Sequence, residues 1–95
     1  EALPLLKAAV ESEPNPRFRA WAMLLLGDLK RPELAEEVFL PHLKSDPVSS
    51  VRANAAAALG LLGGYAAELT EASRKDPDPL VRQIAKEALA KKEDR

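Results

Sequence analysis

The chain has 95 residues, of which 46% are hydrophobic and only 4% aromatic, and 14 Lys and Arg against 15 Asp and Glu give a net charge of −1. This length is enough for one domain with a core, and the balanced charge gives no reason to expect nucleic acid or an anionic membrane as a partner. The absence of Cys and the presence of one His exclude a disulfide, a thiolate nucleophile and a multi-histidine metal site within one chain, so we expect no cofactor.

Apolar residues recur at helical spacing along the whole chain, and no segment shows strand alternation. We expect helices at about 2–12, 16–28, 33–44, 47–62, 65–75 and 78–92. Pro4 is tolerated only in the first turn of the first helix, and Pro41 should loosen the last turn of the third. The fold class predicted is all-α.

Three of these segments repeat one pattern, counted from Pro14, Pro47 and Pro77, which lie 33 and 30 residues apart. A large apolar residue follows at offset 4, Arg at 5, Ala at 8, Leu at 12 and Gly or Ala at 13. The matched residues are Phe18, Val51 and Val81; Arg19, Arg52 and Arg82; Ala22, Ala55 and Ala85; Leu26, Leu59 and Leu89; and Gly27, Gly60 and Ala90. So many matches in three copies indicate an internal repeat. Offsets 4, 8, 11 or 12 and 15 follow the helical period, so we expect them to form one apolar stripe that faces the core.

The repeat also carries signals for helix ends. Asp46 and Asp76 stand where N-caps are expected, each before a proline that suits a first helical turn. Gly27 and Gly60 suit left-handed C-caps. Each repeat therefore opens with a first-type helix, and the shorter helices between the copies are of a second type.

The element DP-x-x-x-VR-x-x-A-x-x-AL-G at residues 46–60 resembles the first helix of HEAT repeats, closest to the short bacterial and archaeal type called the phycobilisome-lyase HEAT-like repeat. The resemblance implies an armadillo-like solenoid, a right-handed α-α superhelix of about six helices in three repeats. A single domain, 1–95, would hold a second-type helix at 2–12 and repeats at about 13–45, 46–75 and 76–95. The first copy departs from the pattern, with Glu13 for Asp and Phe18 for Val.

The family resemblance implies a non-enzymatic protein-binding or scaffold module that uses the concave face formed by the helices at 2–12, 33–44 and 65–75. One alternative is a subunit of an enzyme complex of the bilin-lyase type, which needs an aromatic-lined pocket that this chain can hardly furnish. Another is nucleic-acid binding, as in HEAT-like DNA glycosylases, which needs a basic concave surface. These helices hold more acids than bases, and fold alone does not establish function.

The repeated arginines lie near helix N-termini, where the macrodipole does not favour a cation. The resemblance implies instead a ladder between repeats, in which Arg52 and Arg82 pair with Asp46 and Asp76 across unit boundaries. Arg19 has only Glu11 or Glu13 nearby in sequence.

Several residues are candidates for contact with a protein partner. They are Trp21, Met23, Leu24, Glu33, Glu36, Glu37, Glu68 and Glu71. Trp21 is expected to be partly buried between repeats, with an exposed binding anchor as the alternative. The two glutamate clusters either form an acidic patch for a basic partner or only complement helix N-termini. His42 is expected to face solvent near the end of its helix.

The two ends of the predicted solenoid differ in polarity. The last first-type helix carries Gln83, Lys86 and Glu87 away from its core stripe, as a terminal cap requires. The first carries Met23 and Leu24 there, which predicts an interface. Additional chain, a second copy in a homodimer, or a partner protein would cover this end, unless the helix at 2–12 folds over it.

The location and origin of the protein have weaker signals. The longest apolar run, residues 20–26, is far shorter than the roughly 20 residues of a membrane span, and no signal peptide is visible. We therefore expect a cytoplasmic protein without a membrane partner, although a start at Glu1 leaves preceding residues open. Few Asn and Gln and eight prolines predict thermostability, or equally reflect a GC-rich genome.

Overall fold

The computed structural model describes residues 2–93, with side chains from 2 to 90, and all its regular elements are helical. They are α1 (Ala2–Ser12), α2 (Pro16–Asp28), the π-helical segment η1 (Ala35–Phe39) that runs directly into α3 (Leu40–Ser45), α4 (Ser49–Leu62), α5 (Ala66–Lys75) and α6 (Pro79–Glu93). Counting η1 and α3 as one, there are six helices along residues 2–93. The predicted all-α class is confirmed.

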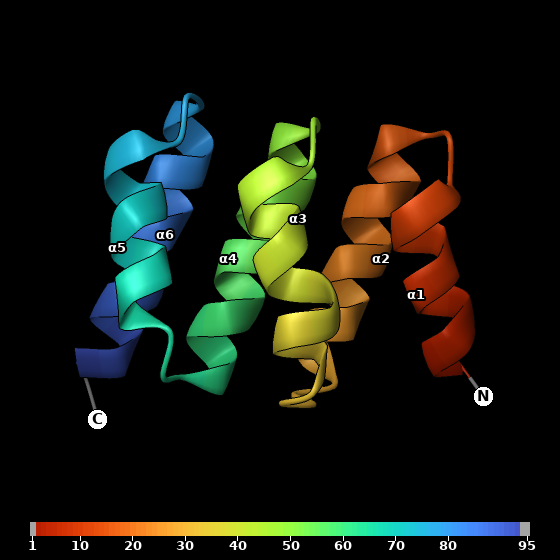
Figure 1. Cartoon of the computed structure of the whole chain (residues 1–95), viewed down its shortest axis with the longest axis horizontal. Coiled ribbons are helices and arrows are strands. Elements are labelled where there is room, and N and C mark those ends of the chain that lie inside the picture. The colour runs from red at the N-terminus through yellow and green to blue at the C-terminus, as the bar shows by residue number, and fades with distance from the viewer. Residues whose placement is uncertain (1, 94–95) are drawn as a thin grey trace.

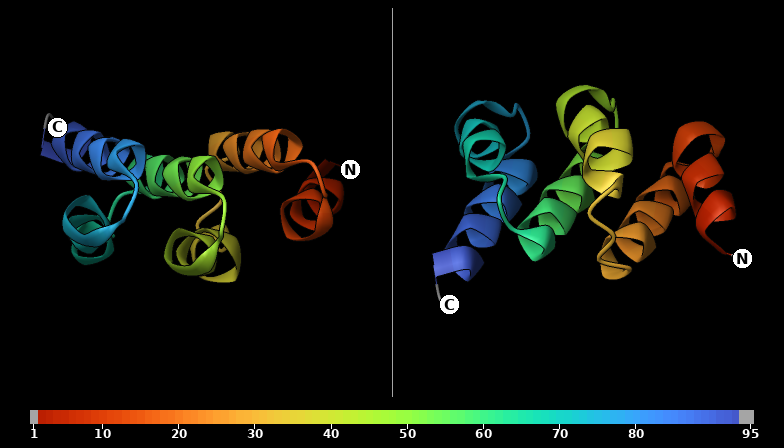
Figure 2. Two further views of the ribbon diagram at one scale, coloured as in Figure 1. Left: turned by 90° about the horizontal axis from the view of Figure 1, so that it is seen from above. Right: turned by 60° about the horizontal axis from the view of Figure 1, so that its bottom comes forward.

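The helices form two rows (Figures 1 and 2). The first row contains α2, α4 and α6, and each of these packs against the next. The second row contains α1, η1 with α3, and α5, and each second-row helix packs against the first-row helix that follows it in the chain. The molecule is therefore a short stack of helix pairs, 33 × 27 × 17 Å in extent.

The core lies between the two rows. Val51, Leu59 and Val81, at repeat offsets 4 and 12, are fully buried, and so is Phe39 of η1. Complete burial of side chains of this size stabilises the fold by about 1.5–3 kcal/mol each. The first copy differs. The repeat pattern predicts Phe18, at offset 4, in the core, but its side chain is 54% exposed.

The two repeat glycines have a different role from the one predicted. Gly27 and Gly60 lie inside α2 and α4, and the left-handed residue after α4 is Gly63, with φ of 77°. A Cβ added to Gly27 would lie 2.9 Å from the Cβ of Ala58, and one added to Gly60 only 2.6 Å from that of Ala88. The C-cap prediction was wrong, since these glycines let successive first-row helices approach closely.

The predicted N-caps are also corrected. Asp46 and Asp76 follow the last residues of α3 and α5, and their Oδ1 atoms accept the N–H groups of Val48 and Asp78 at 2.9 Å. This bond, from a side chain to the amide two residues on, orders the turn before the next helix. The side chain that caps α6 is Asp78, which accepts the N–H of Leu80 at 2.8 Å.

The helix that contains Pro41 departs from α-helical geometry. The sequence predicts this departure in the last turn, but the structure has it at the start of the helix. The N–H of Leu40 donates to the carbonyl of Ala35, five residues back, in the π-helical segment η1. A proline has no N–H and its ring crowds the carbonyl four residues earlier. The wider π turn immediately before Pro41 accommodates both effects.

Candidate protein-binding surfaces

Arginine and aspartate side chains join the repeats at two junctions. The guanidinium of Arg19 donates to both carboxylate oxygens of Asp46. Arg52 donates to the carboxylate of Asp76 from Nε at 2.9 Å and from Nη2 at 3.1 Å. Each arginine thus pairs with the aspartate of the following repeat.

The pairing expected within the ladder is therefore shifted by one repeat. Arg52 reaches Asp46, and Arg82 reaches Asp76, only through the backbone carbonyls, at 2.8 and 2.7 Å. Arg19, which had no obvious partner in the sequence, takes the carboxylate of Asp46 and also donates to the carbonyl of Val10 at 2.9 Å.

These ion pairs are buried and serve the fold. The carboxylates of Asp46 and Asp76 are 1% and 7% exposed. Burial raises the pKa of Asp46, but hydrogen bonds from Arg19, the Val48 N–H and His42 outweigh burial and leave that pKa below its usual value. Burial likewise raises the pKa of Asp76, and bonds from Arg52 and the Asp78 N–H lower it overall. Both carboxylates are therefore engaged by the repeat junctions and not left free for a partner protein.

His42 lies between two carboxylates and does not face solvent as predicted. Its Nδ1 is 2.7 Å from Oδ2 of Asp46, its Nε2 is 3.0 Å from Oε2 of Glu11, and its side chain is 13% exposed. The ring thereby ties α3 to α1. Among the described residues, no group of three His, Asp or Glu side chains is arranged to hold a metal ion.

The largest exposed apolar surface lies at the N-terminal end. Among residues 2–90, seven large hydrophobic residues are exposed, and six of them belong to α1, α2 and the residue that follows α2. These six residues, here called the apolar end, are Leu5, Phe18, Trp21, Leu24, Leu25 and Leu29. Trp21 is 60% exposed, so its expected burial between repeats is not seen. Met23 is fully buried, which removes it from the contact candidates.

Four residues of the apolar end, three on α2 and one directly after it, lie along one face and are here called the α2 stripe. Phe18, Trp21, Leu25 and Leu29 are spaced three or four residues apart, which aligns them along a helix. Leu25 is two residues from Gly27, about 200° around the helix at 3.6 residues per turn, and Gly27 faces α4. The α2 stripe therefore faces away from the rest of the first row.

Later repeats use the same offsets to pack against the preceding first-row helix. Asn54, which corresponds to Trp21, donates to the carbonyl of Ala20 in α2 at 2.8 Å. Ala58, which corresponds to Leu25, packs against Gly27. The α2 stripe thus occupies the position of an inter-repeat contact, and no other helix of the described chain covers it (Figure 2).

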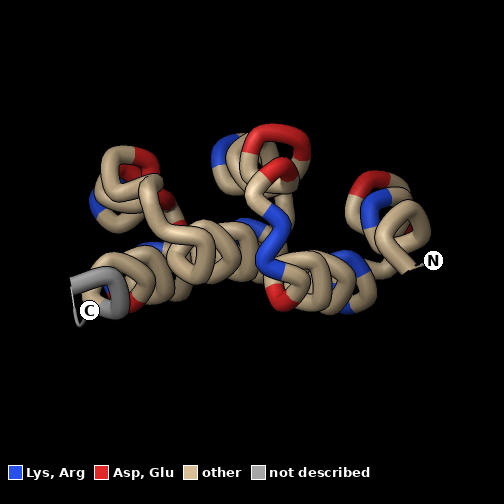
Figure 3. The backbone as a smooth tube through the Cα atoms, turned by 90° about the horizontal axis from the view of Figure 1, so that it is seen from below, with Lys and Arg blue, Asp and Glu red and all other residues tan. Residues whose placement is uncertain are grey.

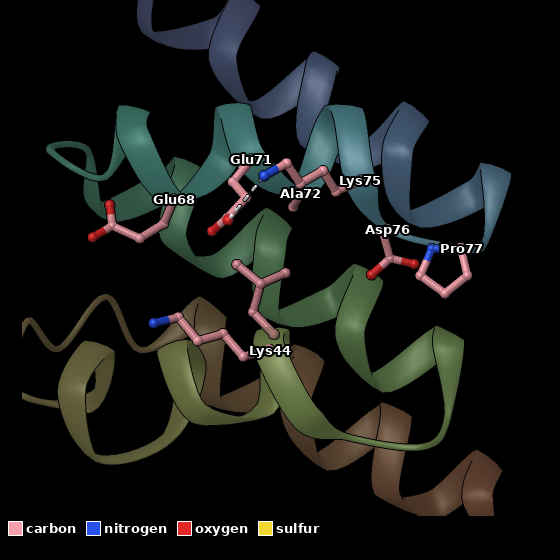
Figure 4. Close-up of a pocket in the computed structure, with 8 residues that line it drawn as sticks. Lys44, Glu68, Glu71, Ala72, Lys75, Asp76 and Pro77 are labelled. Atoms are coloured by element: carbon pink, nitrogen blue, oxygen red, sulfur yellow. Dashed lines mark ion pairs between the residues drawn. The ribbon is translucent and has the colours of Figure 1, made fainter.

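A groove of about 430 Å³ runs between α3 and α5 in the second row (Figure 4). Its lining comprises Leu43, Lys44, Glu68, Glu71, Ala72, Lys75, Asp76 and Pro77. In this groove Lys75 lies 3.8 Å from Glu71, and Asp76 is paired with Arg52. The remaining charged residues of the lining, Lys44 and Glu68, are the ones that could face a ligand. Its charges therefore nearly cancel.

The glutamates expected to form an acidic patch are separated. Only Glu68 and Glu71 line the groove, while Glu36 and Glu37 lie on η1. Glu37 is 3.0 Å from Lys7 of α1, and Glu33 is 2.9 Å from Arg31. Figure 3 shows acidic and basic residues interleaved along the second row.

Comparison with known families agrees with this architecture. The family model described as HEAT repeats matches residues 2–90, nearly the whole chain. The chain belongs to the HEAT-repeat family. No curated protein and no solved structure matches the sequence. In the part of this HEAT-repeat chain that the structure describes, no helix is long and apolar enough to cross a membrane.

Sequence reasoning missed three surface features of this HEAT-repeat chain. The repeat pattern predicts Phe18 and Leu25 in the core stripe, but both are exposed, because no first-row helix precedes α2 among the described residues. The contact of His42 with Asp46 had a signal, because residues four apart meet on one helix face. Its contact with Glu11 had none, since the two are 31 residues apart.

Proposed function

We propose that this HEAT-repeat chain is a non-enzymatic protein-binding module whose main contact surface is the apolar end. HEAT repeats generally mediate protein–protein interaction or scaffolding. The observation that carries the proposal is the exposure of Trp21 and Phe18, at 60% and 54%, within a group of six large apolar residues. Monomeric proteins rarely expose a large contiguous apolar patch, and Trp is enriched among interface hot spots.

The groove between α3 and α5 is the weaker candidate surface. Its apolar floor is nearly covered, because Leu43 and Ala72 are 5% and 9% exposed. Its charged residues largely pair with one another or with Arg52. No aromatic residue lines it, which also argues against the bilin-lyase alternative. A partner would gain little buried apolar area there compared with the apolar end.

Site-specific photo-crosslinking in producing cells tests the proposal. The photoreactive p-benzoyl-L-phenylalanine would replace Leu24, an exposed residue of α2 beside the α2 stripe, and in a matched control Gln83, an exposed residue of α6. We expect a discrete adduct from position 24 that L25E abolishes, and none from position 83. Equal adducts at both positions, or no adduct with either protein or a second copy, would overturn the proposal.

A further inference from the structure

We infer that the α2 stripe binds a second copy of this chain, with the two α2 helices packed antiparallel about a two-fold axis. The inference rests on the proposed function, because it names the occupant of the same apolar end. Three features of α2 support it: bulk that excludes ordinary repeat stacking, symmetry of the stripe, and placement of two charges.

The first feature is the size of the residues on the α2 stripe. At the two junctions within the chain, Ala58 and Ala88 stand at the offset where α2 has Leu25. There even one Cβ on the facing glycine would come within 2.9 or 2.6 Å of the alanine Cβ. Leu25 adds three carbons, so a first-row helix cannot stack on α2 at that spacing.

The same reasoning excludes head-to-tail stacking of copies. In α6 the position of Gly27 and Gly60 is taken by Ala90. If α6 of one copy followed the repeat geometry onto α2 of another, the Cβ of Ala90 would meet Leu25. A helix that contacts Leu25 must lie further away, at the 8–10 Å interaxial distance of ordinary side chains.

The second feature is the symmetry of the α2 stripe. Its midpoint lies between Trp21 and Leu25, so an antiparallel copy places Trp21 opposite Leu25 of the other copy. The same axis places Phe18 near Leu29 of the other copy. A two-fold interface requires such self-complementarity, in which residue i meets j and j meets i. Both members of each pair are exposed in the single chain.

The third feature is the pair of charges beside the stripe, Arg17 and Asp28. Both are exposed, and neither forms an ion pair with any of the described residues. They lie on the same flank, about 16 Å apart along the axis at 1.5 Å per residue. Antiparallel packing brings each Arg17 to Asp28 of the other copy. In a parallel pair the same flank of the two helices lies on opposite sides of the interface, so neither charge gains an opposite charge there.

The positions of these charges within α2 support a partner outside the chain. A cation in the first turn and an anion in the last turn are both disfavoured by the helix macrodipole. Arg17 and Asp28 occupy those two turns of α2. Among the described residues no ion pair offsets this arrangement, but between antiparallel copies each charge gains an opposite charge.

Leu5 of α1 is a further exposed apolar residue near this end of the chain. Lys7 and Glu11 mark the flank of α1 that contacts η1 and α3. Leu5, two residues from Lys7 and about 200° around the helix, is 74% exposed on another flank. The exposed apolar residues are far fewer than the roughly 20–30 residues a side of a standard interface, so we expect a dissociation constant on the order of micromolar or weaker.

Sedimentation velocity of the chain between 5 and 500 μM tests the inference. We expect a monomer–dimer equilibrium that R17D and D28R each weaken about five- to tenfold, and that the double variant R17D/D28R restores. K86E, a charge reversal on exposed α6, serves as the matched control and should leave the equilibrium unchanged. L25E should abolish the dimer, with circular dichroism to show that the exposed substitution leaves the helices intact.

Each other outcome overturns a defined part of the inference. A dimer insensitive to the charge swap would exclude the antiparallel pairing, and growth beyond two copies would indicate head-to-tail stacking. A monomer at every concentration whose position 24 still crosslinks to another protein would overturn the second copy and leave the proposed function standing. A monomer without adducts would overturn both.

Discussion

The two junctions of the first row, α2 with α4 and α4 with α6, share one plan and differ in the side chain that stands beside the aspartate. At each, an arginine reaches the aspartate of the next repeat, and a glycine admits an alanine of the next helix. Four residues before Asp46 stands His42, but four before Asp76 stands Ala72. Only the first junction therefore carries a third side chain on its carboxylate.

His42 and Ala72 also line the two hollows between neighbouring helices of the second row. His42 lies in the hollow between α1 and α3, which has a volume of about 290 Å³. Ala72 lies in the equivalent hollow between α3 and α5, which has about 430 Å³. The comparison teaches that the arginine–aspartate pair and the glycine contact are kept in both repeats, while the side chain four residues before the aspartate changes the surroundings of the ion pair.

The largest effect that would separate the junctions is removal of an arginine. R52A leaves the buried carboxylate of Asp76 with only the Asp78 N–H, and we expect a loss of about 3 kcal/mol in the free energy of unfolding. R19A should cost about 2 kcal/mol, since His42 and the Val48 N–H still bond Asp46. Urea unfolding at pH 7 measures both.

The control for the variants R52A and R19A is R74A, which removes an exposed arginine that forms no ion pair among the described side chains. It should change the unfolding free energy by no more than about 0.5 kcal/mol. If R19A proves as costly as R52A, His42 does not support Asp46 and the comparison of the two junctions fails.

The next effect concerns how closely the helices approach. G60A introduces a Cβ 2.6 Å from Ala88 Cβ and 3.1 Å from its Cα, which α6 can relieve only by moving. Overpacking of this kind costs about 1–3 kcal/mol, and the gain of up to about 1 kcal/mol in helix propensity offsets part of it. We expect G60A to lower the melting temperature more than G27A, whose Cβ meets Ala58 at 2.9 Å.

G63A is the control for this comparison, because nothing lies within 4 Å of an added Cβ there. Its positive φ of 77° means that any loss comes from backbone strain and not from crowding. Equal gains in melting temperature from G27A and G60A would show that helix propensity, and not the approach of the helices, decides the outcome.

Sequence alone predicted what depends on local spacing. The helices at 2–12 and 16–28 came from apolar periodicity and proline positions, and both coincide with α1 and α2. The role of Gly60 was misread, because a glycine near a helix end suits a C-cap and a close contact equally well. Only the position of Ala88, 28 residues away, decides between them.

The candidate surface was predicted less completely, for a related reason. The apolar end followed from composition, but which of its residues are exposed depends on how α2 is rotated against α1 and α4. Met23 and Leu24 are neighbours of similar character, yet Met23 is fully buried and Leu24 is 44% exposed. The partner carboxylate of Arg19 was equally hidden, since Asp46 is 27 residues away and meets it only once the repeats stack.

The smallest effect is the pH dependence of the second junction. The pKa of Asp76 is lowered in the folded state, so its contribution to stability is fully present above the ordinary value of 3.8 and is lost as the pH falls through the folded value. A protonated Asp76 has no charge for Arg52 to compensate. The deficit of R52A relative to the parent chain, measured by urea unfolding between pH 7 and 2.5, should therefore stay constant down to about pH 4 and shrink below it. R74A should show no such trend, and a deficit for R52A that stays constant to pH 2.5 would mean that the arginine acts through packing of its stem and not through its charge.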